Sequence, residues 1–236
     1  MYKRIILKLS GETLAPETLE GSKSPTFDAL RVEEVARVIA ELAGMGVQVG
    51  VVMGGGNIWR GRFSEEMNAV NADQMGMLAT VINALAVEDA LCRLGQKATV
   101  FTAQEMNRFA RLYTAKAAIE CMENGEIVLL AGGTGNPFFT TDTGAALRAA
   151  EIGAEALLLA KNTDYVYTAD PKVDPNAQPI PEIGYVEVID RGLSVMDNSA
   201  LTLCMDNRIP ILVFGLKAEN SIRRVACGER IGTIIH

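Results

Sequence analysis

The sequence predicts an α/β fold, specifically a three-layer α/β/α sandwich around a mostly parallel central sheet. Short, β-branched apolar runs stop near glycines, and amphipathic helical patterns separate these runs along most of the chain. Nearly half of the 236 residues are apolar, which is enough to bury a substantial core. We therefore expect helices on both faces of one sheet.

The amino-terminal part predicts one βαβ unit. Residues Arg4–Leu9 and Val47–Met53 are apolar runs typical of strands buried on both faces, which favours parallel pairing. A helix is expected between them, because apolar residues at helical spacing precede two glycines: Val32, Val35, Ile39 and Leu42, then Gly44 and Gly46.

The alternation continues through the middle of the chain. A helix is predicted over Met75–Leu94, with one apolar face made of Leu78, Val81, Ile82, Leu85 and Leu91. The elements predicted after it are a strand at Ala98–Thr102, a strand at Ile127–Ala131, a helix at Thr143–Ile152 and a strand at Ala156–Leu159.

After Lys161 the pattern changes. Tyr165–Thr168 and Tyr185–Ile189, separated by a proline-rich loop, suggest an antiparallel excursion. We expect a single domain, 1–236, with a lobe boundary here that separates residues 1–160 from 161–236. The remaining elements are predicted as helices at Asn198–Asn207 and Ser221–Ala226 and strands at Ile211–Phe214 and Thr233–Ile235. Ala15–Phe27, rich in Pro, Gly and Ser, is expected to be an exposed loop.

Composition excludes several classes of protein. The net charge is −7 and no basic aromatic stripe is present, which argues against a nucleic-acid partner. No apolar stretch approaches the roughly 20 residues that span a bilayer, so no membrane partner is expected. The four cysteines form no CxxC pair or disulfide framework, and the start of the chain has no secretion signal, so a cytoplasmic protein is expected.

Three predicted strands end in glycine-rich turns: Lys8–Glu12, Gly54–Asn57 and Gly132–Pro137. In an open α/β sheet such turns lie together at the carboxyl ends of the strands, where ligands bind. Glycine lets backbone N–H groups approach phosphate oxygens, although each turn alone is equally consistent with a tight strand-to-helix connection. The Walker and dinucleotide-binding motifs are both missing, so another kind of phosphate site is needed.

Lys8 ends an apolar strand, on the same face as Ile6. A lysine at a strand end often only extends to solvent, but beside three glycine turns a phosphate partner is favoured. The single histidine, His236, argues against Ser-His or Cys-His catalysis and against a His-rich metal site, and no protein metal site is predicted. Phosphoryl transfer instead needs Lys, Arg, backbone N–H groups and Mg²⁺.

The segment Gly135–Gly144, GNPFFTTDTG, is the most specific feature. Its threonines and asparagine offer short donors beside a helix start, its two phenylalanines offer a stacking surface, and Asp142 offers a carboxylate. A helix cap by Thr141 or Asp142 is expected as well, because capping and anion binding use the same helix end.

Several stretches together resemble the bacterial UMP kinases of the amino acid kinase superfamily. They are KRIILKLSGE, GVVMGGGNIWRG, DQMGMLATVINALA, AGGTGNPFFTTDTGAALRA, YTADP, SVMD and GERIGT, and they extend over nearly the whole chain. The resemblance implies the amino acid kinase fold, with an acceptor-side lobe at 1–160 and an ATP-side lobe at 161–236. It implies a kinase that transfers the γ-phosphate of ATP to UMP, giving UDP and ADP, in pyrimidine nucleotide biosynthesis.

The resemblance also assigns residues to roles. The catalytic set that it implies is Lys8, Asp142 and Lys161. The implied ATP-binding set is Lys8, Leu9, Ser10, Gly11, Gly56, Arg60, Asn162, Tyr167 and Asp170. The implied UMP-binding set is Gly55, Asp73, Thr134, Gly135, Asn136, Pro137, Phe138, Phe139, Thr140 and Thr141.

Mg²⁺ bound with ATP, a homo-hexamer, activation by GTP and inhibition by UTP are further implications of the resemblance. The chain departs from the family where Ala15–Asp28 replaces a shorter glycine-rich stretch ending in FGID, and where Lys161–Asn162 precede Thr-Asp-Tyr rather than DG. Two alternatives remain open. One is an aspartate, carbamate or N-acetylglutamate kinase, against which GNPFFTTD argues, and the other is a non-catalytic nucleotide sensor.

Overall fold

The computed structural model describes residues 1–236 except 17–25, 61–66, 172 and 217. Among the described residues, one sheet of nine strands runs through the molecule, and only the pair β10·β11 is antiparallel. In spatial order its strands are β4 (Arg111–Leu112), β3 (Ala98–Thr102), β5 (Ile127–Ala131), β2 (Gln48–Met53), β1 (Arg4–Leu9), β6 (Ala156–Lys161), β10 (Ile211–Gly215), β11 (Thr233–Ile235) and β9 (Glu182–Ile183). A separate antiparallel pair joins β7 (Val166–Tyr167) to β8 (Pro179–Ile180).

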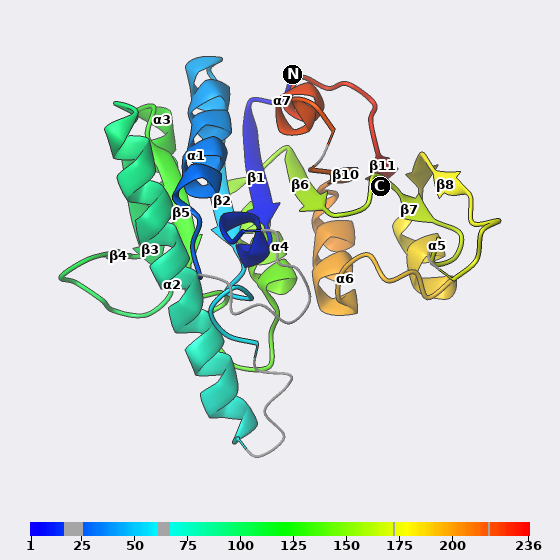
Figure 1. Cartoon of the computed structure of the whole chain (residues 1–236), viewed down its shortest axis with the longest axis horizontal. Coiled ribbons are helices and arrows are strands. Elements are labelled where there is room, and N and C mark those ends of the chain that lie inside the picture. Colours follow the sequence, from blue (N-terminus) through cyan, green and yellow to red (C-terminus); the bar gives the residue numbers. More distant parts are fainter. Residues whose placement is uncertain (17–25, 61–66, 172, 217) are drawn as a thin grey trace.

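Helices cover both faces of the sheet, which confirms the predicted fold class (Figure 1). One apolar cluster packs the sheet against α1 (Ala29–Gly44), α2 (Ala69–Arg93) and α7 (Ser221–Ala226), with the short 3₁₀ helix η1 (Gly11–Leu14) beside them. The opposite cluster packs it against α3 (Ala115–Glu123), α4 (Thr141–Ile152), α5 (Tyr185–Asp190) and α6 (Asn198–Asn207). The sheet continues across residue 161, and the division into two lobes stays a prediction.

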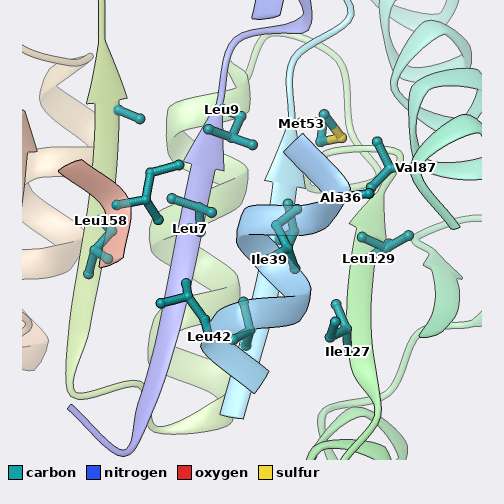
Figure 2. Close-up of a cluster of buried hydrophobic side chains, with 14 of the residues drawn as sticks. Leu7, Leu9, Ala36, Ile39, Leu42, Met53, Val87, Ile127, Leu129 and Leu158 are labelled. Atoms are coloured by element: carbon teal, nitrogen blue, oxygen red, sulfur yellow. The ribbon is translucent and has the colours of Figure 1, made fainter. Parts of the chain in front are cut away.

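The two faces of β1 follow the alternation of a strand. Leu7 and Leu9 belong to the cluster under α1, where Figure 2 shows them beside Ile39 and Leu42. Ile6 belongs to the opposite cluster, with the alanines of α4. Lys8 is two residues after Ile6 in the strand, so its side chain lies on the same face of the sheet as Ile6, as the sequence predicted. Helix α4 covers this face.

Helix α2 differs from its prediction in start and in orientation. It begins at Ala69, where Asn68 caps it by accepting from Val70 N at 3.0 Å, so Asp73 lies inside the helix. In the predicted apolar face, Leu78 and Ile82 are 50% and 48% exposed, whereas Val81 and Leu91 are buried. The prediction was right for Val81 and Leu91 and wrong for Leu78 and Ile82, because most of the buried face consists of other residues: Ala79, Thr80, Asn83, Ala84, Val87 and Ala90.

Helix α2 is also long and apolar enough to meet the length and composition criterion for a membrane span, with less than half of its most apolar window buried. The expectation that no segment approaches this length was therefore wrong. A core helix of a globular domain passes the same test, and α2 packs against α1 and β3. Its first turns extend past the carboxyl ends of the strands (Figure 1).

The carboxy-terminal part needs one correction. Residues Tyr185–Asp190 form a helix, α5, not a strand, because Tyr185 and Val188 are buried at a spacing of three residues. The antiparallel partner of β7 is Pro179–Ile180. Four further elements, η1, β4, α3 and β9, were not predicted from the sequence. Most of the predicted Ala15–Phe27 loop lies outside the described residues.

Candidate active site

The carboxyl ends of β1, β2 and β5 meet at one edge of the sheet, and the three glycine turns follow them. The turns after β1 and β2 are in contact, since Gly54 N donates to Leu9 O at 2.9 Å. Helix α4 packs closely on the third turn, where a Cβ on Gly144 would lie 3.3 Å from the Gly133 backbone. A cavity of about 560 Å³ opens here, lined by Gly55, Gly56, Trp59, Arg60, Ala72, Asp73, Gly76, Met77, Thr80, Gly133, Thr134, Asn136, Phe138, Phe139, Thr140 and Thr141.

Lys8 and Asp142 form a nearly buried ion pair, with 2.7 Å between Lys8 Nζ and Asp142 Oδ1. Their side chains are only 13% and 15% exposed. Apart from Lys8, no hydrogen-bond donor to Asp142 Oδ1 is found within the described part of the chain. Asp142 lies in the first turn of α4, where the helix dipole favours a carboxylate.

Lys161 ends β6, next to β1, and adds a second cation. Its Nζ donates to Val195 O at 2.5 Å. Burial lowers the pKa of Lys161; nearby Asp142 opposes this effect and Lys8 adds to it. The structure therefore brings together the three residues predicted to be catalytic.

The segment before α4 is held by hydrogen bonds to α6. Thr140 Oγ1 caps α4 by accepting from Asp142 N at 3.0 Å and Thr143 N at 3.2 Å, and its hydroxyl donates to Asp197. Thr143 Oγ1 donates to the same carboxylate at 3.0 Å. The N-cap is thus Thr140 rather than Thr141 or Asp142. Its single hydroxyl proton is committed to Asp197, so Thr140 lines the cavity without a proton to donate to a ligand.

Asp73 holds the GNPFF segment directly. Its Oδ2 accepts from Phe138 N at 2.7 Å, and Phe138 has a φ of 70°, a left-handed conformation that is costly for a residue other than glycine. Phe138 and Phe139 are exposed at the cavity. Asp73 therefore stabilises the shape of this segment as well as offering a carboxylate to a ligand.

Three side chains form hydrogen bonds with the backbone of the turn after β5. Thr80 Oγ1 accepts from Gly132 N at 2.8 Å. The buried Arg148 of α4 donates to Gly133 O at 3.1 Å and lies 3.9 Å from the centre of the Tyr113 ring. Gln104 Nε2 donates to Gly135 O at 2.8 Å. The backbone of this turn is therefore preorganised.

The turn after β1 presents mostly backbone. The Leu9 side chain is buried in the core, so only its backbone can contact a ligand. Ser10 caps η1, and its hydroxyl accepts from Glu12 N at 3.4 Å. Arg60 Nε donates to Gly56 O at 3.2 Å, and its guanidinium pairs with Glu12 over the Gly56 turn.

Some predicted residues are not among those that line this cavity, and they include the catalytic set and the turn after β1: Lys8, Leu9, Ser10, Gly11, Asp142 and Lys161. Gly135 and Pro137 are not among its lining residues, although their neighbours are. Asn162 and Asp170 are exposed and Tyr167 is half-buried in β7, all in the segment that follows β6. Their ATP-binding role stays a prediction.

Six residues that line the cavity are absent from the predicted site: Gly133, Trp59, Ala72, Gly76, Met77 and Thr80. The last three follow Asp73 by three, four and seven residues, which places them on one face of α2. A helix start before Asp73 would have identified them. Trp59 Nε1 donates to Ala72 O at 2.9 Å, which ties the second turn to the same helix.

Comparison with known proteins agrees with this geometry. The model of the amino acid kinase family matches residues 3–215. A uridylate kinase from Bacteroides thetaiotaomicron is 50% identical, with 100% of this chain and 98% of the relative covered. UMP kinase structures from Bacillus anthracis and Ureaplasma parvum superpose with TM-scores of 0.94 and 0.91 at 37% and 36% identity. Each covers 100% of this chain, and the alignments take in 96% and 99% of those two chains. The chain belongs to the amino acid kinase family and, within it, to the uridylate kinases.

Proposed function

We propose that this chain is an ATP-dependent UMP kinase that converts UMP to UDP and uses the residues described above. The observation that carries the proposal is the ion pair of Lys8 and Asp142, with Lys161 beside it, at the strand ends next to a cavity that contains Asp73. The assignment of UMP as the phosphate acceptor rests on the uridylate kinase and UMP kinase relatives. An aspartate, carbamate or N-acetylglutamate kinase is disfavoured by this likeness over the full chain.

The acceptor side is built from the cavity. We assign the Gly55–Gly56 turn and Arg60 to the phosphates of both nucleotides, and the UMP ribose to Asp73. The exposed rings of Phe138 and Phe139 offer a surface for the uracil. Because the Asp73 carboxylate has two oxygens, a ribose hydroxyl can donate to it while Phe138 N stays bonded to Oδ2.

The donor side is the Lys8–Gly11 turn and the end of β6. In the transfer, an oxygen of the UMP phosphate forms a bond to the γ-phosphorus while the bond to the β,γ-bridging oxygen breaks, leaving ADP. The acceptor is already anionic, so no general base is needed. Lys8 and Lys161 neutralise charge on the transferred group, and Asp142 holds Lys8 in place.

The residues present fit a Mg²⁺ ion that arrives with ATP. The described residues contain no group of three potential protein ligands, and Mg²⁺ in kinases is usually held by substrate phosphates plus one or two carboxylates. Asp142, whose buried Oδ1 has Lys8 as its one partner in the described structure, offers one carboxylate to such an ion. When bound, the ion supplies positive charge to the ATP phosphates.

Assembly, regulation and location complete the proposal. Self-association is supported by the exposed apolar side chains of α2, namely Met75, Leu78 and Ile82, and the proposed number of six copies rests on the resemblance to the bacterial enzymes. Activation by GTP, inhibition by UTP and a cytoplasmic location rest on the resemblance to the bacterial enzymes.

The test is a coupled ADP-release assay with UMP, CMP, aspartate and carbamate as acceptors. The proposal expects turnover with UMP far above that with the other three. ADP release with aspartate or carbamate, and not with UMP, would favour another amino acid kinase. Nucleotide binding without ADP release would favour the non-catalytic sensor.

A further inference from the structure

A pair of asparagines lies directly beneath the turns assigned to the phosphates. Asn83 of α2 is 0% exposed, although it is polar and lies in the core face of the helix. Its Nδ2 donates to Gly54 O at 2.6 Å and to Asn57 Oδ1 at 2.8 Å. Asn57 Nδ2 donates back to Asn83 Oδ1 at 3.0 Å and to Thr26 O at 3.0 Å. All four amide protons are therefore used.

The donor turn packs directly on this pair. A Cβ on Gly11 would lie 2.4 Å from Asn57 Oδ1, 2.5 Å from Gly54 O and 3.0 Å from Asn83 Nδ2. The two turns also share the hydrogen bond from Gly54 N to Leu9 O. The asparagine pair thus joins three segments at one point: the turn after β1, the turn after β2, and α2, which carries Asp73.

Such a pair needs a reason beyond stability. A buried amide gains little net free energy over an apolar side chain of similar shape, because it must first lose its hydrogen bonds to water. A directed network instead fixes one arrangement of the groups that it joins. Only a primary amide can donate to Gly54 O and exchange reciprocal hydrogen bonds with a second amide at this site.

We propose that Asn57 and Asn83 are positioning residues that fix the spacing between the donor and acceptor phosphate turns. The inference rests on the proposed phosphoryl transfer, in which the attacking and leaving oxygens must lie in line with the γ-phosphorus. Neither asparagine touches the substrate in this role. Displacing one turn against the other slows the transfer step, whereas the ribose contact at Asp73 stays in place.

The first variant is Asn83→Leu, which keeps the branching and the number of side-chain heavy atoms and removes the three hydrogen bonds that Asn83 makes to Gly54 and Asn57. We expect kcat to fall at least 10-fold, while the UMP dissociation constant from titration calorimetry stays within about 3-fold of wild type. The matched control is Gln48→Leu, because Gln48 accepts from Arg4 Nε at 2.7 Å at the opposite end of the same two strands. That variant should keep wild-type kcat.

A second readout does not depend on activity. Amide hydrogen exchange should be faster at Gly54 in Asn83→Leu than in the wild type, with the central strands still protected. This result is expected whichever acceptor the wild-type protein phosphorylates, so it separates a failure of this inference from a failure of the proposed function. If Asn83→Leu does not fold, Asn57→Ala at the half-buried turn takes its place. Unchanged exchange at Gly54 would overturn the proposal. So would kcat within 2-fold of wild type, or parallel losses of kcat, UMP affinity and melting temperature.

Discussion

Replacing Lys8 by Met tests the catalytic assignment and the ion pair together. Met keeps most of the aliphatic volume of lysine and removes its charge. At 2.7 Å and an effective dielectric constant of about 20, the attraction between Lys8 and Asp142 is about 6 kcal/mol before desolvation is counted. Removing one partner of a buried pair costs about 3–5 kcal/mol, because the other charge is left buried.

The stability and the rate should respond by different amounts. A loss of 3–5 kcal/mol lowers the melting temperature by about 6–20 °C in a chain of this size, yet leaves it folded at 25 °C. Loss of the charge that neutralises the transferred phosphoryl group should lower kcat about 100-fold or more, while either KM changes much less.

The assay pairs steady-state kinetics with thermal melting, and the double variant Lys8→Met/Asp142→Asn is the control. Because no charge is left buried and unpaired at this position, the double variant should recover much of the melting temperature without recovering kcat. A kcat of Lys8→Met near the wild-type value would refute the role of Lys8. Recovery of kcat together with stability in the double variant would reduce that role to folding.

Three further predictions follow from the site. Asp73→Ala should weaken UMP binding by about 1–3 kcal/mol and narrow the discrimination against 2′-deoxy-UMP, because the ribose hydroxyl and Phe138 N both lose an acceptor; unchanged calorimetric affinity would remove Asp73 from the site. Burial lowers the pKa of Lys161 from its ordinary value of 10.5. At a pH between the lowered pKa and 10.5 the unfolded chain binds more protons than the folded one, so the free energy of unfolding rises with pH. Lys161→Met should flatten that rise in melting temperature, stabilise the ligand-free protein at neutral pH and lower kcat; an unchanged pH profile of the melting temperature would contradict this. Gly11→Ala should cost about 1–3 kcal/mol by overpacking against Gly54 O and Asn57, whereas the control Gly44→Ala, with no atom within 4 Å of the new Cβ, should be neutral or slightly stabilising; equal melting temperatures for the two variants would count against the tight packing at Gly11.

Strand positions and the glycine turns could be predicted because their determinants are local. Alternation along Arg4–Leu9 placed Lys8 on the face opposite Leu7 and Leu9, and the structure confirms it. The glycine turns at the strand ends followed from the same reasoning, because parallel strands bring their carboxyl ends to one edge.

The orientation of α2 could not be predicted in the same way. Two of its large apolar residues, Leu78 and Ile82, are exposed, whereas its inner face contains alanines and Asn83 beside Val87 and Leu91. Small residues allow a helix to approach the sheet closely, and a buried amide is accommodated only when its partners are in place. Those partners, Asn57 and the Gly54 carbonyl, come from a segment far away in the sequence.

Tertiary contacts also decided the role of one site residue and the type of one element near the end of the chain. The resemblance pointed to Thr140 as a UMP contact, but its hydroxyl proton goes to Asp197, 57 residues away. The strand predicted at Tyr185–Ile189 failed because its β-branched residues favour a strand locally, while burial of Tyr185 and Val188 selects a helix. In both cases tertiary contacts decide between two locally acceptable readings.

The most direct test of the central claim follows the phosphoryl group itself. ATP carrying ¹⁸O at the three non-bridging oxygens of its γ-phosphate is incubated with the protein, Mg²⁺ and UMP, and the nucleotides are examined by mass spectrometry. The account predicts UDP whose β-phosphate carries all three labelled oxygens, formed in a one-to-one ratio with ADP, and at least 100-fold more slowly with Lys8→Met. Labelled inorganic phosphate without labelled UDP would contradict it.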